Sequence, residues 1–372
     1  MKHKILFRTI SRLSQWFVIL AVLFSLLGMN PVQAAPAGTA LQFNGSSQYV
    51  TFGASQGLAA PGLGVQTFTI ETWFKRTGTG AVTSTSAAGG GGLLSAIPLV
   101  TKGRGEGDGS DVDMNYWLGI DSATNVLVAD FEECAPATAG CPAGSTAGLN
   151  HAVFGTTAIQ NNVWYHAAVT YDGQVWKLYL NGNVDKTLDI GANRFPRWDS
   201  RQHAGIGTAM TSAAVAAGFF AGVIDETRIW NVARSQADIQ ASMNSELTSG
   251  TGLIGRWGLN ENTGTTANNS IAGRPNGTLT PTATPPTWVA GFPIPDTTPP
   301  AAPANLAASA LGQTVNLSWT PNSEPDLAGY NVYRSTSPSV PLTGPINGGT
   351  LLTSASYTDS GRSYGTPYYY VV

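Results

Sequence analysis

Carboxylates are the residues of this sequence with the clearest catalytic potential. Hydrolysis of a glycosidic bond uses two carboxyl groups about 5–9.5 Å apart, which acids two or four residues apart can provide on one face of a strand. Asp111 and Asp113 have that spacing, but they lie in a glycine-rich, charged stretch. Glu71 has no acidic partner two residues away, and Asp225 and Glu226 would face opposite ways on a strand. The acids therefore predict no catalytic centre.

Trp198 is the candidate residue for binding a ligand. It lies in a proline-containing loop with three arginines close by in the sequence, Arg194, Arg197 and Arg201. An exposed ring at this position would stack on a sugar ring. The alternative is that Trp198, like most of the ten tryptophans, packs in the core.

The first 35 residues predict export. An apolar run at 16–27 follows four basic residues, Lys2, Lys4, Arg8 and Arg12. Val32-Gln33-Ala34 then supplies small residues at the −3 and −1 positions of a cleavage site after Ala34 or Ala35, which is the layout of a signal peptide at 1–35. The alternative is an uncleaved anchor, although the run is short for a bilayer. Cleavage leaves 15 basic and 22 acidic residues, so we expect a mildly acidic exported protein with no membrane insertion and no nucleic acid partner.

The two cysteines, Cys134 and Cys141, are close in sequence. An oxidising compartment allows them to pair, and a loop this short would stabilise the fold by about 2–3 kcal/mol. A zinc site needs nearby histidines, and His151 lies ten residues further on. We expect a disulfide, with two free thiols as the alternative.

The composition favours strands and turns. The 372 residues include 44 glycines, and only 11% are charged, against about 25% in a typical domain. Short alternating runs at 68–74, 164–171 and 176–180 are separated by turn pairs such as Asn181-Gly182. This pattern predicts an all-β fold, an antiparallel β-sandwich. One helix is expected from Ser235 to about Leu247, where Ser235 would cap the first turn.

Prolines divide the chain. Residues 281–303 contain eight of them, which predicts a semi-rigid linker. We place the linker itself at 291–303, between a large domain at 36–290 and a smaller one at 304–372.

Ordered motifs across the large domain resemble the laminin-G-like jelly-roll domains of the concanavalin A-like lectins and glucanases. The resemblance implies two curved antiparallel sheets packed face to face. It rests on the following segments: 40–50, 68–73, 164–166, 179–182 and 220–230, then 253–257, 261–264, Asn276-Gly277 and Trp288. The glucanases of this family carry a Glu-x-Asp-x-x-Glu strand, and the sequence lacks it.

The tail resembles a fibronectin type III domain, which implies a second, immunoglobulin-like sandwich. Residues 315–319 would form its second strand and 329–334 its third, and Tyr368, Tyr370 and Val372 would face inward on the sixth. The sequence ends before a seventh strand. We therefore expect an incomplete domain and a fragment of a longer protein.

The family resemblance also implies a possible calcium ion. It places Asp225 near the first turn at Asn44, and calcium favours oxygen ligands of this kind. The alternative is that Asp225 only forms hydrogen bonds to that turn.

These features predict a secreted or surface-displayed, non-catalytic binding or adhesion protein whose partner is an extracellular glycan or protein. Two alternatives stay open. The chain could be the accessory binding region of an exported glycoside hydrolase whose catalytic domain lies beyond residue 372, or it could be a structural stalk. The identity of the ligand is not encoded in these motifs, because specificity lies in variable loops.

Overall fold

The computed structural model describes residues 38–372 except 87–89, 108–110, 295–299 and 323–326. The predicted signal peptide at 1–35 lies outside the described residues. The chain divides between Ile294 and Pro295 into two compact units, a position that falls within the stretch expected to be the linker. Among the described residues, no helix is long and apolar enough to span a membrane.

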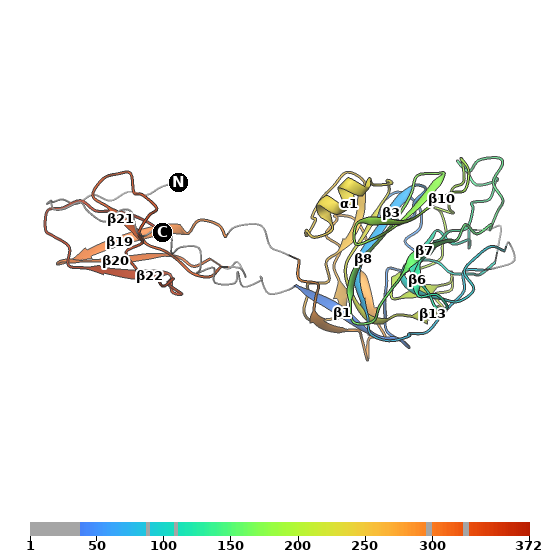
Figure 1. The fold of residues 1–372 in the computed structure, drawn as a ribbon, viewed down its shortest axis with the longest axis horizontal. Coiled ribbons are helices and arrows are strands. Elements are labelled where there is room, and N and C mark those ends of the chain that lie inside the picture. Colours follow the sequence, from blue (N-terminus) through green and yellow to red (C-terminus); the bar gives the residue numbers. More distant parts are fainter. Residues whose placement is uncertain (1–37, 87–89, 108–110, 295–299, 323–326) are drawn as a thin grey trace. The chain divides into compact units, whose positions relative to one another are not determined.

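The larger unit contains two antiparallel sheets (Figure 1). The first, sheet A, has β15 (Leu253–Trp257) paired to β14 (Ala221–Trp230) outside the main strand order. The other strands of sheet A lie in this order: β10 (Asn183–Asp189), β9 (Val175–Leu180), β8 (Trp164–Tyr171), β3 (Phe68–Arg76), β14 (Ala221–Trp230), β1 (Thr39–Asn44) and β18 (Thr287–Ala290).

The second, sheet B, also has eight strands. A separate two-stranded ribbon, β12 (Thr208–Met210) with β13 (Ala216–Phe219), comes directly after the strand at Ala204–Ile206 in the chain. Sheet B has the order β16 (Thr266–Ala267), β17 (Gly277–Thr280), β2 (Tyr49–Thr51), β11 (Ala204–Ile206), β4 (Ala96–Lys102), β5 (Tyr116–Asp121), β6 (Val126–Asp130) and β7 (Val153–Ala158).

The hydrophobic core lies between the two sheets. Alternation in β3 shows why: Phe68, Ile70 and Phe74 point into the core, while Glu71 and Trp73 point to the other face. Residues of sheet B such as Leu118 join the same cluster. The predicted all-β, antiparallel jelly-roll sandwich is therefore confirmed. The segment after residue 253 completes it, because β15, β16, β17 and β18 extend the two sheets.

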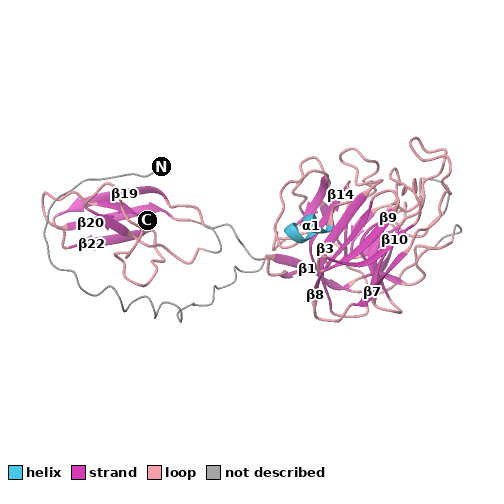
Figure 2. Ribbon diagram, turned by 45° about the horizontal axis from the view of Figure 1, so that its top comes forward, coloured by secondary structure: helices cyan, strands magenta, loops and turns pink. Residues whose placement is uncertain are grey.

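One short helix, α1 (Gln236–Ser242), covers part of the outer face of sheet A (Figure 2). The side chain of Ser235 accepts a hydrogen bond from the backbone N–H of Asp238, and the Asp238 carboxylate accepts one from the backbone N–H of Ser235. Ile239 is fully buried against Ala168 and Tyr179 of the sheet. The predicted capping is confirmed, but the helix ends five residues before the expected Leu247.

The smaller unit consists of small sheets. Three strands pair in the order β19 (Ala304–Leu311), β20 (Thr314–Thr320) and β22 (Ser356–Ser360), and β21 (Tyr333–Ser335) pairs with β23 (Tyr369–Val371). Trp319, Tyr330 and Tyr370 are among the buried residues of its core. The expected third strand at 329–334 is shorter than predicted, and the fibronectin type III identity stays a prediction.

Candidate functional site

Glu71 lies at the centre of a charged cluster on the outer face of sheet A. Its side chain is fully buried. Its Oε1 accepts hydrogen bonds from the Trp230 indole N–H at 2.9 Å and from an Arg234 guanidinium N–H at 3.1 Å. Arg228, directly opposite on β14, lies 3.5 Å from the same oxygen. We call these residues together with His166 the Glu71 centre.

His166 completes the Glu71 centre from β8. Its Nε2 lies 3.5 Å from Glu71 Oε2, and its side chain is only 1% exposed. Burial lowers the pKa of His166 to about 4, and the positive charges of Arg228 and Arg234 oppose the effect of Glu71. Burial therefore favours the neutral imidazole, and His166 is a buried residue of the sheet.

Two further ion pairs, both formed by Glu226, extend the Glu71 centre. Glu226 pairs with Arg228 at 3.0 Å and with Arg256, and its side chain is 1% exposed. Arg228 also donates to the backbone carbonyl groups of Ser242 and Ser245 at the end of α1. These charges therefore fasten the helix to the sheet.

The two acids with catalytic spacing are not on a strand. Asp113 is fully buried, and its Oδ2 lies 3.7 Å from an Arg197 nitrogen. Asp111 lies at the surface in an ion pair with Arg201 at 3.2 Å. Because one carboxylate faces the interior and the other faces solvent, they do not form a catalytic pair.

Asp225 and Asn44 do not meet, so the expected proximity is wrong. Asn44 is the strand partner of Ala221, four residues before Asp225, which separates the two by about 13 Å along the strand. The Asp225 carboxylate accepts the backbone N–H groups of Glu226 and Phe292, both at 2.8 Å. These two residues do not fit one calcium ion, and the described residues contain no cluster of three His, Cys, Asp or Glu arranged for a metal. Calcium itself stays a prediction.

Asp225 is instead buried. Burial, and then the nearby negative charge of Glu226, raise the pKa of Asp225 to about 8. Phe292, whose N–H it accepts, stacks on Trp73 with ring centroids 3.4 Å apart. Asp225 therefore fixes the segment that leaves the sandwich.

Trp198 is buried, so the prediction of an exposed ring is wrong. Only 7% of its surface is exposed. Its backbone carbonyl lies close to Gly64, where a Cβ atom would collide with it, and its ring lies beside Gly140. The loop folds back on the sandwich, because the indole gains more from burial than from water.

Cys134 and Cys141 form the predicted disulfide, with their Cα atoms 6.0 Å apart. Beside it, Glu133 pairs with His151 at 3.1 Å and with Arg194 at 3.0 Å. These contacts hold the loops around the disulfide and place Arg194 in an ion pair.

An uncharged groove of about 590 Å³ lies at the edge of the sandwich, near the last strand of each sheet, β18 and β16. Three connections build it, between β1 and β2, between β15 and β16, and between β17 and β18. We call it the Trp288 groove. Nine residues line it: Gln48, Asn262, Thr263, Gly264, Thr284, Pro285, Pro286, Thr287 and Trp288.

Trp288 and Gln48 give the groove its shape. Trp288 is partly buried against the core, and its indole N–H donates to the Gly264 carbonyl at 3.1 Å. The Gln48 amide donates to the carbonyl groups of Thr284 and Pro285 at 3.0 and 2.8 Å. Asn44 in turn accepts the backbone N–H groups of residues 46–48. The role of Asn44 is thus to hold the turn that carries Gln48.

Sequence reasoning missed the Trp288 groove. Gln48, Asn262 and Trp288 all stood in motifs that carried the family resemblance. Nothing in the sequence indicated that segments more than 200 residues apart would line one groove. The available signal was the concentration of Thr, Asn and Gly at 262–288, a stretch that ends on Trp288 and has Arg274 as its single charged residue.

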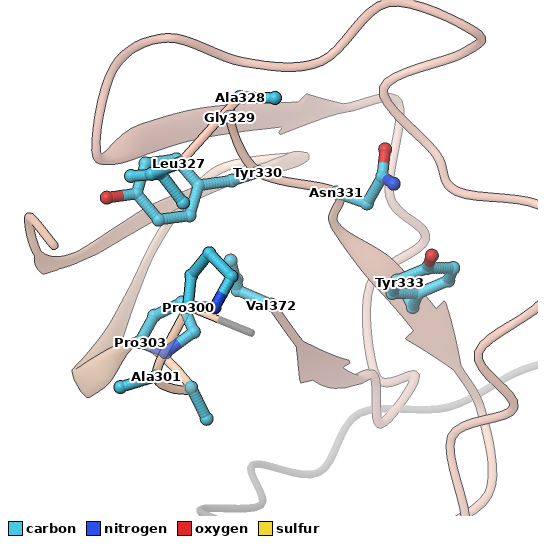
Figure 3. A pocket seen from close by; sticks show the side chains of 11 residues that line it. Pro300, Ala301, Pro303, Leu327, Ala328, Gly329, Tyr330, Asn331, Tyr333 and Val372 are labelled. Carbon is cyan, nitrogen blue, oxygen red and sulfur yellow. The ribbon is translucent and has the colours of Figure 1, made fainter. Parts of the chain in front are cut away.

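The smaller unit has its own pocket of about 400 Å³ (Figure 3). Leu327 and Tyr330 face Pro300, Pro303 and Val372 across it. Most of the lining is apolar, and its polar side chains are Tyr330, Asn331 and Tyr333.

Solved structures with related folds include several carbohydrate-binding proteins. A candidate carbohydrate-binding protein from Bacteroides ovatus is 18% identical, with a TM-score of 0.45 over 68% of this chain, which spans 60% of the length of that protein. The CBM40 module of a Ruminococcus gnavus sialidase, bound to α2,3-sialyllactose, is 18% identical over 54% of this chain and 95% of the module, with a TM-score of 0.37. Domain 4 of a Geobacillus stearothermophilus arabinanase, in complex with arabinotriose, is 17% identical over 54% of this chain and 75% of that domain, with a TM-score of 0.31.

No curated protein matches the chain. A family profile matches residues 44–240, more than half of the sequence. These residues run from the turn at Asn44 through most of both sheets to α1. The chain therefore belongs to the concanavalin A-like lectin/glucanases superfamily.

Proposed function

We propose that this chain is the carbohydrate-binding part of an exported protein and that it does not hydrolyse its ligand. The superfamily unites lectins with glucanases, so membership alone does not choose between binding and hydrolysis. The choice of binding over hydrolysis rests on where the carboxyl groups lie. Glu71 and Asp113 are fully buried near arginines, and Asp111 forms a surface ion pair. A glycosidase needs two carboxyl groups that face one bond.

Export is supported by the disulfide, because such bonds persist in oxidising compartments. The sandwich also supplies a rigid scaffold on which loops recognise a ligand. A protein ligand and a role in adhesion stay predictions.

Binding and hydrolysis can be separated in one screen. The purified full chain is applied to an array of neutral and acidic glycans, and the same glycans are incubated with it and assayed for released reducing ends. We expect binding to at least one glycan and no release of sugar. Release that is abolished by Glu71→Gln or Asp111→Asn would overturn the proposal in favour of an enzyme, and an array with no bound glycan would refute carbohydrate recognition.

A further inference from the structure

We propose that the Trp288 groove is the glycan site and that it takes a neutral sugar. This inference rests on the proposed function and adds the place and the ligand class. The groove combines an aromatic ring with amides and hydroxyls and has no charged residue in its lining. Its volume of about 590 Å³ falls within the range of about 300–1,000 Å³ that is usual for ligand pockets.

The groove is held in shape before any ligand arrives. Both N–H groups of the Gln48 amide are used on carbonyls of the β17–β18 connection, and its oxygen accepts the Asn44 backbone N–H at 3.0 Å. The Trp288 indole N–H fixes the turn at Gly264. A site with fixed loops loses less conformational entropy on binding. Gln48 is therefore a positioning residue.

Other polar groups of the groove remain available to a ligand. Asn262, Thr263 and Thr287 are exposed, and their side chains make no hydrogen bond to any described residue. An amide and hydroxyl groups offer both donors and acceptors, which match the hydroxyl groups of a sugar. The partly buried Trp288 ring supplies an apolar surface beside them, as the C–H face of a sugar ring requires.

The absence of charge from the lining selects the ligand class. A sialic acid or uronic acid would bring a carboxylate into a groove whose lining holds no Lys or Arg. Removing that carboxylate from water without a cationic partner is unfavourable. A neutral sugar has no such cost, so the groove discriminates against acidic glycans.

The central test measures affinity in the full chain. Calorimetry uses the neutral oligosaccharide with the strongest array signal, and compares wild type with Trp288→Ala. We expect the affinity to fall about tenfold or more, as for a buried aromatic anchor. Trp164→Ala is the matched control, because Trp164 is also partly buried on sheet A but contacts Lys75 and Phe292 outside the groove. That control should keep wild-type affinity.

A second variant guards against misfolding of Trp288→Ala. Asn262 is exposed with a backbone φ of 57°, and Asn193, far from the groove in sequence, is exposed with a φ of 62°. Asn262→Gly and Asn193→Gly therefore have the same backbone effect, because glycine tolerates a positive φ. Only Asn262→Gly should weaken binding, by about three- to tenfold for one lost hydrogen bond.

The outcomes distinguish the two proposals. Glycan binding that persists unchanged in both Trp288→Ala and Asn262→Gly would overturn the site and leave the proposed function standing. Binding confined to acidic glycans would overturn the ligand class. No binding of any array glycan by the wild-type chain would refute the proposed function, and with it this inference.

Discussion

The Glu71 centre and the Trp288 groove use polar residues in opposite ways. The Glu71 centre holds one carboxylate, two arginines and a histidine beneath α1, and each of these is largely or fully buried. The groove holds amides, hydroxyls and an indole at the open edge of the sandwich. In this molecule the residues that most resemble a catalytic site serve the fold, while neutral residues are available to a ligand.

The physical reason lies in the cost of moving charge from water. A buried carboxylate is tolerated only when cations and hydrogen-bond donors surround it, so its partners leave no room for a substrate. An amide or hydroxyl at the surface stays hydrated and exchanges water for sugar hydroxyls at little cost. Charge density therefore marks structural clusters in this sandwich, and its absence marks the candidate binding site.

The largest effect is expected from Glu71→Ala. The substitution leaves Arg234 without its anion and leaves Arg228 with Glu226 alone, and breaking such a buried pair costs about 3–5 kcal/mol of unfolding free energy. Urea denaturation of the full chain, followed by tryptophan fluorescence, measures this loss. Asp111→Asn is the control, because a surface ion pair contributes about 0–1 kcal/mol. Equal, small losses in both variants would contradict the structural role of the Glu71 centre.

Two tryptophans provide the next contrast. Trp198 is 7% exposed in the interior of its loop, so Trp198→Ala should cost about 3 kcal/mol of unfolding free energy and leave glycan affinity unchanged. Trp288→Ala should instead lower the glycan affinity and cost less unfolding free energy than Trp198→Ala. Paired denaturation and calorimetry of the two variants test this. Loss of affinity in a folded Trp198→Ala protein would restore the original interpretation of that loop.

The fold was largely predictable from the sequence because alternation in runs such as 68–74 directly encodes which side chains face the core. The disulfide and the Ser235 cap were predictable for the same reason, since both depend on residues close in sequence. The site was not. Its three connections come together only through the pairing of β1 with β18 and of β2 with β17.

The errors at Trp198 and Asp225 have a common origin. Neighbouring arginines suggested that Trp198 is exposed, but Arg194 and Arg197 pair with acids of the interior loops. Register decided the position of Asp225, and a four-residue offset along β14 separates it from Asn44. Sequence patterns show which residues alternate, but strand register determines which of them meet.

Acidification should weaken the Glu71 centre while leaving the groove unaffected. His166 has a pKa of about 4 in the folded protein, below the ordinary value of about 6.5 in the unfolded chain. The unfolded state therefore binds more protons between these values, and stability falls as the pH falls through this window. At pH 5 the contribution is about 2 kcal/mol relative to pH 8. His166→Gln should show a correspondingly smaller acid loss in denaturation curves, and an identical pH slope in both proteins would refute this assignment.

The smallest effect on stability is expected at the groove, and it sharpens the comparison most. Asn262 makes no side-chain hydrogen bond to a described residue and is exposed, so Asn262→Gly should change the unfolding free energy by at most about 0.5–1 kcal/mol. Asn193→Gly, at a similar positive φ, should change it equally. If the groove is a recognition surface, only Asn262→Gly loses affinity for the neutral oligosaccharide, although the two variants have the same melting temperature. A larger stability loss at Asn262 than at Asn193 would instead mean that this side chain supports the fold, as the charged residues around Glu71 do.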